Sequence, residues 1–152
     1  MAKEKKPKEL KLTFEQLIAM HQQQRALIES LANQENLIRN LIRETQATQD
    51  ALNEIKKTKK LANILVPLGS GVFSYAKLAN TSEVRMEIGG NVFETMPISR
   101  AINKLEDRKA GLERNLKQII ERKRKAIAFT TQLERLIAEA QRKAREQVQG
   151  VA

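Results

Sequence analysis

The sequence predicts a mainly α fold with a small β part: a long antiparallel two-helix coiled coil whose helices are joined by two central β-hairpins. Three observations predict it. Both arms of the 152-residue chain are rich in Ala, Glu, Lys, Leu, Arg and Gln, and proline interrupts neither of them. Apolar residues recur in both arms at a coiled-coil spacing of about 3.5 residues. The segment between them is punctuated by glycine and rich in β-branched and aromatic residues.

The same patterns set the expected boundaries. Residues 1–63 form an N-terminal coiled-coil helix with a short basic tail, residues 64–97 form the two hairpins, and residues 98–152 form a C-terminal coiled-coil helix. We expect these three parts to make up one domain.

The first helix has a readable start in LTFEQL. Thr13 can be the N-cap, Gln16 its reciprocal partner in a capping box, and Leu12 and Leu17 the residues of a hydrophobic staple. From there a heptad frame gives the expected seam positions, most of them apolar. They are Leu17, Met20, Gln24, Leu27, Leu31, Gln34, Ile38, Leu41, Thr45, Thr48, Leu52, Ile55, Lys59 and Ala62.

The second helix gives a similar heptad frame. Its expected seam positions are Ile102, Leu105, Lys109, Leu112, Leu116, Ile119, Lys123, Ala126, Thr130, Leu133, Ile137, Ala140, Ala144 and Gln147. Each arm runs for about 50 residues, so the two can pair antiparallel along their whole length. If the chain folds back near residue 80, Leu27 lies near Leu133 and His21 near Glu139.

Four short strands are expected in the middle segment. ILVPL, VFSYAKL, VRMEI and NVFET are separated by the glycine turns Gly69–Gly71 and Gly89–Asn91 and by the polar link Ala79–Glu83. Two such hairpins are marginally stable alone, and their unpaired edges invite further pairing. We therefore predict oligomerisation through a shared sheet or closed β-barrel. The residues expected in that interface are Ile64, Leu65, Val66, Leu68, Val72, Phe73, Tyr75, Val84, Met86, Ile88, Val92 and Phe93.

Composition excludes several classes of function. The chain has no cysteine, so it has neither disulfides nor thiolate metal sites, and no apolar run reaches membrane-spanning length. Its one histidine, His21, is too few for a metal site and fits a seam or surface position. No catalytic constellation and no phosphate-binding glycine loop is present. The sequence predicts a soluble cytoplasmic protein that is not an enzyme and binds no cofactor, metal or membrane.

The formal charge of +10 leaves two interpretations open. KKTKK (Lys56–Lys60) and ERKRK (Glu121–Lys125) are dense basic clusters that could contact phosphates. They can equally be solvated helix faces, because acidic residues alternate with basic ones nearby. A basic coiled-coil scaffold or nucleic-acid-binding architectural protein is therefore the alternative function, although nucleic acid is the less favoured partner.

Two stretches carry a resemblance to a known family. ILVPLGSGVFSYAKL (residues 64–78) and NVFETMPISRAINKLEDR (residues 91–108) resemble the two hairpins and the returning helix of α-type prefoldin subunits. The resemblance implies a hexamer of two α-type and four β-type subunits around a β-barrel platform. It also implies an ATP-independent holdase that captures unfolded polypeptides at coiled-coil tips and delivers them to a group II chaperonin. Self-assembly of this chain is a further option. Many family members are acidic, whereas this chain is basic.

Capture of unfolded chains needs exposed, adaptable apolar surface at the distal end of the helices. The residues expected there are Leu10, Leu12, Phe14, Leu17, Ile18, Met20, Leu133, Leu136, Ile137, Val148 and Val151. The alternative is that these side chains only complete the coiled coil and fray near the termini. The two interpretations differ in how many of these side chains remain accessible when the helices are paired.

Overall fold

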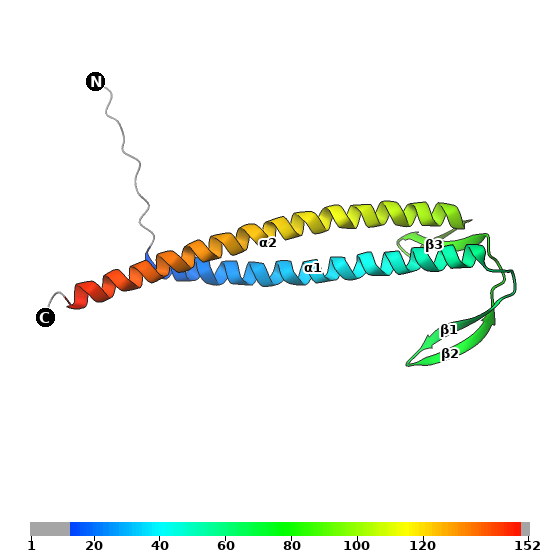
Figure 1. Ribbon diagram of the computed structural model, residues 1–152, viewed down its shortest axis with the longest axis horizontal. Helices are drawn as coiled ribbons and strands as arrows, with labels where there is room; N and C mark the ends of the chain where they lie inside the picture. The colour runs from blue at the N-terminus through cyan, green and yellow to red at the C-terminus, as the bar shows by residue number, and fades with distance from the viewer. Residues whose placement is uncertain (1–12, 150–152) are drawn as a thin grey trace, which may run out of the picture. The chain divides into compact units, whose positions relative to one another are not determined.

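The computed structural model describes residues 13–149, and the side chains of residues 13–146. The elements follow in the order α1 (Phe14–Lys57), β1 (Asn63–Gly69), β2 (Val72–Lys77), β3 (Glu83–Gly89), β4 (Val92–Pro97) and α2 (Ile98–Gln149) (Figure 1). The predicted mainly α fold with two hairpins is confirmed. The chain divides into two compact units. The hairpin unit contains residues 37–116, and the helix-end unit contains the described parts of residues 1–36 and 117–152.

The first helix begins with the predicted capping box. The Thr13 backbone N–H donates to Gln16 Oε1 at 2.9 Å, and the Gln16 N–H donates to Thr13 Oγ1 at 3.3 Å. These two bonds satisfy backbone donors that the first helical turn leaves without partners. The other proposed element of this start, a staple from Leu12 to Leu17, includes a residue outside the described range.

The helix ends earlier than the heptad frame implied. Thr58 Oγ1 donates to the Glu54 carbonyl at 2.7 Å, and the backbone turns through Leu61, whose φ is 66°. The Leu61 N–H then donates to the Leu78 carbonyl beside the first hairpin, at 2.9 Å. The expected seam positions Lys59 and Ala62 therefore lie beyond the helix, in the connection to β1.

The two helices run in opposite directions within each unit (Figure 1). In the helix-end unit, His21 Nε2 lies 3.1 Å from Glu134 Oε1. In the hairpin unit, Gln49 Nε2 donates to Glu106 Oε2 at 2.8 Å. The antiparallel pairing is confirmed, but the register is not. His21 meets Glu134 and not the neighbourhood of Glu139, an offset of a little over one helical turn of 3.6 residues.

Burial along α1 corrects half of its predicted heptad frame. The positions from Leu17 to Leu52 at seven-residue intervals are buried, apart from a half-buried Gln24. From Leu17 to Thr45 the second seam position lies four residues after each of these, not three, and is buried or half-buried throughout. Its residues are His21, Ile28, Glu35, Ile42 and Gln49. Of the residues predicted for this position, Met20 is half-buried beside the seam, and four are exposed: Leu27, Gln34, Leu41 and Thr48. Ile55, near the end of the helix, is half-buried against the core, as predicted.

The reason for the difference is that polar side chains in the seam are paired across it. Counting apolar residues favours Met20, Leu27 and Leu41 over positions that include His21 and Glu35. Glu35, however, forms an ion pair with Lys123, and the buried Gln49 binds Glu106. Because the partners satisfy one another, these polar groups can occupy the seam without unmet hydrogen bonds.

The frame of α2 is confirmed over most of its length. Every predicted seam position from Ile102 to Ala140 is buried or half-buried. The polar ones are satisfied, since Lys109 Nζ donates to Gln46 Oε1 at 2.7 Å and Thr130 Oγ1 donates to the Ala126 carbonyl at 2.9 Å. Ala144 is exposed, and the side chain of Gln147 lies outside the described residues.

The four strands form two separate antiparallel hairpins, with β1 pairing β2 and β3 pairing β4. The predicted turns are confirmed. In each, three consecutive residues have positive φ, the left-handed region that glycine enters at least cost. Gly69, at 106°, and Gly89, at 129°, occupy the first of these positions and mark a register shift in each hairpin.

The core of the hairpin unit joins the second hairpin to both helices. Met96 of β4 is 1% exposed and packs with Leu52 of α1 and with Ile98, Ala101 and Leu105 of α2. Val84, Met86, Ile55 and Ile102 pack against this cluster. The Ile98 N–H also donates to the Ser82 carbonyl at 2.9 Å, which ties the start of α2 to the start of β3. Among the described residues, no helix is both long and apolar enough to cross a membrane.

Candidate binding surfaces

The first hairpin is apolar on both faces and has little cover within the described chain. Leu65 of β1 lies opposite Tyr75 of β2, and these side chains are 58% and 86% exposed. Pro67 lies opposite Phe73 on the same face. On the other face Val66 is also exposed. A two-stranded sheet with apolar side chains on both faces is not expected to stay uncovered in water, so this hairpin is a candidate interface.

The second hairpin differs because it has one covered and one polar face. Val84 and Met86 are half-buried against the core that contains Met96. Its opposite face carries Arg85 and Glu87, both exposed. The Arg85 guanidinium carbon lies 5.8 Å from the centroid of the Phe93 ring, within cation–π range. This hairpin therefore presents apolar surface mainly near its turn.

The predicted interface residues accordingly fall into two groups. Nine are exposed: Leu65, Val66, Leu68, Val72, Phe73, Tyr75, Ile88, Val92 and Phe93. Three are half-buried: Ile64, Val84 and Met86. The exposed group gathers towards the turn of each hairpin, where the sequences Leu68-Gly69 and Ile88-Gly89 are each followed by a Val-Phe pair. The two turns thus share a sequence pattern: an aliphatic residue and glycine, two turn residues, and then Val-Phe. This pattern is visible only when the two hairpins are aligned, and not in the composition of the segment.

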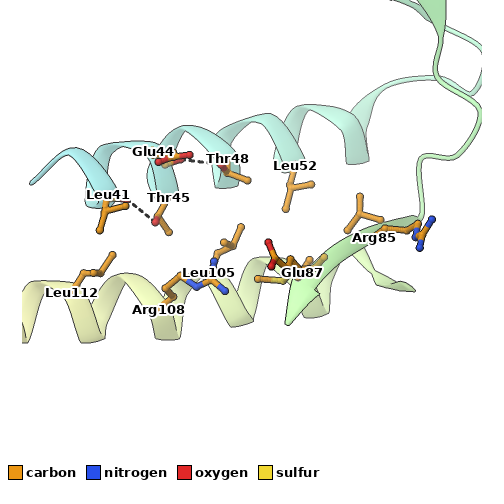
Figure 2. Close-up of a pocket in the computed structure, with 13 residues that line it drawn as sticks. Leu41, Glu44, Thr45, Thr48, Leu52, Arg85, Glu87, Leu105, Arg108 and Leu112 are labelled. Atoms are coloured by element: carbon orange, nitrogen blue, oxygen red, sulfur yellow. Dashed lines mark hydrogen bonds between the residues drawn. The ribbon is translucent and has the colours of Figure 1, made fainter. Parts of the chain in front are cut away.

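A groove in the hairpin unit contains residues that the sequence did not single out as a site. Figure 2 shows Leu41 and Leu52 of α1 facing Leu105 and Leu112 of α2, with Glu87 of β3 at one end. The cavity has a volume of about 540 Å³. Leu41 is exposed to it because the α1 frame leaves this residue beside the seam. The groove can accept apolar side chains, since its floor is continuous with the core residues Leu52 and Leu105.

The predicted client-binding residues are distributed unevenly in the helix-end unit. Phe14 is 44% exposed and Leu136 is 47% exposed. Ile18, Met20 and Ile137 are half-buried. Leu17, at 7%, and Leu133, at 1%, are buried in the seam and are accessible only if the helices separate. Leu10, Leu12 and Val151 lie outside the described residues, and Val148 lies in α2 with its side chain outside the description.

A second groove lies on one side of the helix pair in this unit. Its lining includes Leu27 and Leu31 of α1 and Phe129 of α2, with Arg122 and Lys125 among its polar residues. The heptad frame predicts Leu27 in the seam and gives Phe129 no role. Their position in the sequence could have identified them, because each lies one residue away from a seam residue: Leu27 from the half-buried Ile28, and Phe129 from the buried Thr130.

The basic clusters are solvent-facing. All four lysines of Lys56–Lys60 are exposed, at the end of α1 and just beyond it, and Lys57 Nζ lies 3.3 Å from Glu54 Oε1. In the Glu121–Lys125 cluster only Lys123 turns into the seam, towards Glu35. No group of three or more potential metal-binding side chains occurs in the part of the chain that the structure describes.

Comparison with known proteins shows the family to which the chain belongs. The family profile described as Prefoldin subunit matches residues 24–143. The prefoldin subunit alpha of Methanothrix thermoacetophila is 32% identical over 114 residues, which cover 75% of this chain and 74% of that protein. The prefoldin subunit alpha of Methanosarcina barkeri is 29% identical over 106 residues, covering 68% of this chain and 74% of the relative.

A solved structure agrees on the fold. A chain from the filamentous prefoldin of Methanocaldococcus jannaschii superposes with a TM-score of 0.56 at 20% identity, covering 87% of this chain and 98% of that one. At this identity the likeness concerns the fold alone. The profile match and the sequence relatives carry the assignment: the chain belongs to the prefoldin subunit family, a family of chaperones, and resembles its α-type members.

Proposed function

We propose that this chain is a subunit of an ATP-independent holdase that captures unfolded polypeptides and passes them to a group II chaperonin in the cytoplasm. Membership of the prefoldin subunit family supports the chaperone class. The observation that carries the capture step is the exposure of Phe14 and Leu136 beside a seam already filled by Leu17 and Leu133. Side chains that the coiled coil does not need are available for apolar segments of a client.

Assembly through the hairpins is the second part of the proposal. The first hairpin exposes Leu65, Phe73 and Tyr75, and the second exposes Val92 and Phe93. Covering side chains of this size stabilises an interface by about 1.5–3 kcal/mol for each one fully buried. We propose that these hairpins pair with β-type subunits in a barrel of two α-type and four β-type chains, with self-assembly as the route when no partner is present.

Capture by this surface would be reversible. Partial burial of a few apolar side chains contributes only a few kcal/mol, and the ordering of a client segment offsets part of it. Weak binding at each coiled coil becomes tight only when several coiled coils bind one client, because the later contacts are intramolecular. The assembly of several subunits and the capture step therefore belong to one mechanism.

The test is suppression of aggregation of a denatured protein by the full chain mixed with a β-type prefoldin subunit. A variant with Phe14→Ser and Leu136→Ser should lose most of the suppression, because it removes the exposed apolar side chains without touching the buried seam. Leu37→Ser is the matched control, since Leu37 is 59% exposed but belongs to the hairpin unit. Equal suppression by the double variant and the wild type would place capture elsewhere.

Nucleic acid is a second candidate partner, because the four lysines of Lys56–Lys60 are exposed and could contact phosphates. The same preparation distinguishes the two functions by salt. Hydrophobic capture should persist from low to moderate salt, whereas binding through phosphate contacts weakens steeply as salt rises. Binding of a labelled single-stranded DNA at low salt that is lost as salt rises, together with no suppression of aggregation, would favour the second function.

A further inference from the structure

The two sides of the helix pair in the helix-end unit differ in chemistry. On one side, the groove that contains Leu27 and Phe129 has a cavity volume of about 280 Å³, and its charged lining residues are Arg122 and Lys125. No carboxylate lines it. On the opposite side, two alanines and Ile28 form the apolar part of the lining, and Glu29 and Glu134 accompany its one arginine. Apolar surface and cations without a lining carboxylate therefore coincide on one side only.

The cations of this groove are available to a ligand. Within residues 13–146, Arg122 is exposed and has no hydrogen bond or ion pair. Lys125 has one, with Nζ 3.8 Å from Glu121 Oε1, in a pair whose side chains are 76% and 54% exposed. An exposed pair with this separation holds its lysine weakly. A carboxylate arriving at the groove would thus meet one free guanidinium and one ammonium that exchanges partners readily.

The apolar floor continues along the same side of each helix. At intervals of seven residues, α2 carries Arg122, Phe129 and Leu136 on this side, and α1 carries Met20 and Leu27. Phe129 is half-buried, and Leu136 and Leu27 are 47% and 38% exposed. The stripe therefore offers apolar contacts on both helices with positive charge at one end, which is the complement of an apolar segment that carries acidic residues.

The geometry points to this groove as a client subsite that prefers unfolded segments in which large apolar side chains lie next to Asp or Glu. The inference rests on the proposed capture of unfolded polypeptides and adds a substrate class to it. Apolar side chains of the segment pack on Leu27 and Phe129, and a neighbouring carboxylate accepts hydrogen bonds from the Arg122 guanidinium. Charge complementarity argues for this occupant over the chain's own basic segment, residues 1–11, which repels the same cations.

The test measures binding of two fluorescently labelled peptides to the full chain by anisotropy. The peptides share their length and their apolar residues and differ only in carrying Glu or Lys at the intervening positions. The wild type should bind the Glu peptide about three- to tenfold more tightly at 0.1 M salt, given the usual strength of exposed charge pairs. The preference should shrink towards 1 M salt, where the Debye length falls to about 3 Å.

Two arginines only two residues apart give a matched pair of variants. Arg122→Glu should remove or reverse the preference, whereas Arg124→Glu, the same charge change at a residue that does not line the groove, should leave it. Phe129→Ser should weaken both peptides alike. Circular dichroism checks that each variant keeps its helix content. If Arg122→Glu and Arg124→Glu changed the preference for the Glu peptide equally, the preference would arise from the net charge of the chain. This result would overturn the subsite.

The remaining outcomes separate this inference from the proposed function. If the wild type suppresses aggregation but binds the two peptides equally, the subsite is wrong and the holdase proposal stands. If it neither suppresses aggregation nor binds either peptide, both fail. If Phe129→Ser changes the sedimentation coefficient of the chain, the groove is an interface with a second copy, which also overturns the client subsite.

Discussion

His21 Nε2 on α1 lies 3.1 Å from Glu134 Oε1 on α2, and the two side chains are 19% and 59% exposed. This contact fixes the register of the helix pair in the helix-end unit, because it joins one identified turn of each helix. It also places His21, rather than Met20, at the α1 seam position that follows Leu17. The same choice repeats one heptad later, where Ile28 takes the seam position and its neighbour Leu27 is left beside it.

Truncation of these two neighbours tests the α1 frame directly. Ile28→Ala should lower the free energy of unfolding by about 2–4 kcal/mol, because it leaves a cavity in the seam. Leu27→Ala should cost about 1 kcal/mol or less, since this side chain is 38% exposed. Urea denaturation followed by circular dichroism measures both. If Leu27→Ala lowered the free energy of unfolding more than Ile28→Ala, the heptad frame predicted from the apolar residues would be correct instead.

Glu35 and Lys123 form an ion pair across the same seam, with side chains 12% and 28% exposed. Replacement of either residue alone by Leu removes this ion pair and leaves the remaining charge partly buried in the seam, and we expect each to cost about 1–3 kcal/mol of unfolding free energy. The double replacement by Leu should recover most of that loss, because apolar residues can fill the seam equally well. A double-mutant cycle from thermal or urea denaturation gives the coupling between them.

The cycle has a clear contrary result. If the two single losses simply add in the double variant, the residues do not interact across the seam. A second readout is pairing specificity, since a polar pair in an apolar seam can fix register. Cross-linking of cysteines introduced at exposed positions of α1 and α2 would then give one dominant pair in the wild type and several in the double-Leu variant.

The hairpins could be predicted from sequence because their chemistry is local. Gly69 and Gly89 adopt φ values that side chains disfavour, so glycine marks these turns directly. The capping box of Thr13 and Gln16 is local in the same way. Each signal lies within a few residues of the structure that it specifies, and each was found where predicted.

The coiled-coil register and the binding grooves could not be predicted, because they depend on partners distant in sequence. A frame built on apolar residues does not select His21 or Glu35 for the seam, because their partners Glu134 and Lys123 lie far away in the sequence. Because Ile28 and not Leu27 occupies the seam of α1, Leu27 lines a groove beside it. Exposure of an apolar side chain in a two-helix coil is thus decided by the register, which apolar periodicity alone leaves open.

Attachment of the second hairpin to the helices can be tested at two adjacent residues of β4. Met96 is 1% exposed in the core of the hairpin unit, so Met96→Ala should cost about 2–5 kcal/mol. Thr95 points to the opposite face of the strand and is exposed, so Thr95→Ala should cost about 1 kcal/mol or less. Hydrogen exchange of the β3 and β4 amides should show the same contrast, and equal protection in both variants would contradict the packing of this hairpin on α1 and α2.

Assembly through the hairpins predicts a change of size for a single charge near a turn. Val72 is 56% exposed within the described chain, so Val72→Asp should leave the isolated fold stable, yet it would bury a carboxylate in any barrel that includes β2. We expect sedimentation to show smaller species for this variant mixed with a β-type prefoldin subunit, and full-sized complexes for Thr95→Asp, which adds the same charge on the polar face of the second hairpin. A Val72→Asp chain that still forms complexes of the wild-type mass would exclude the first hairpin from the interface, because an unpaired carboxylate buried there would cost more than the loss of one valine contact.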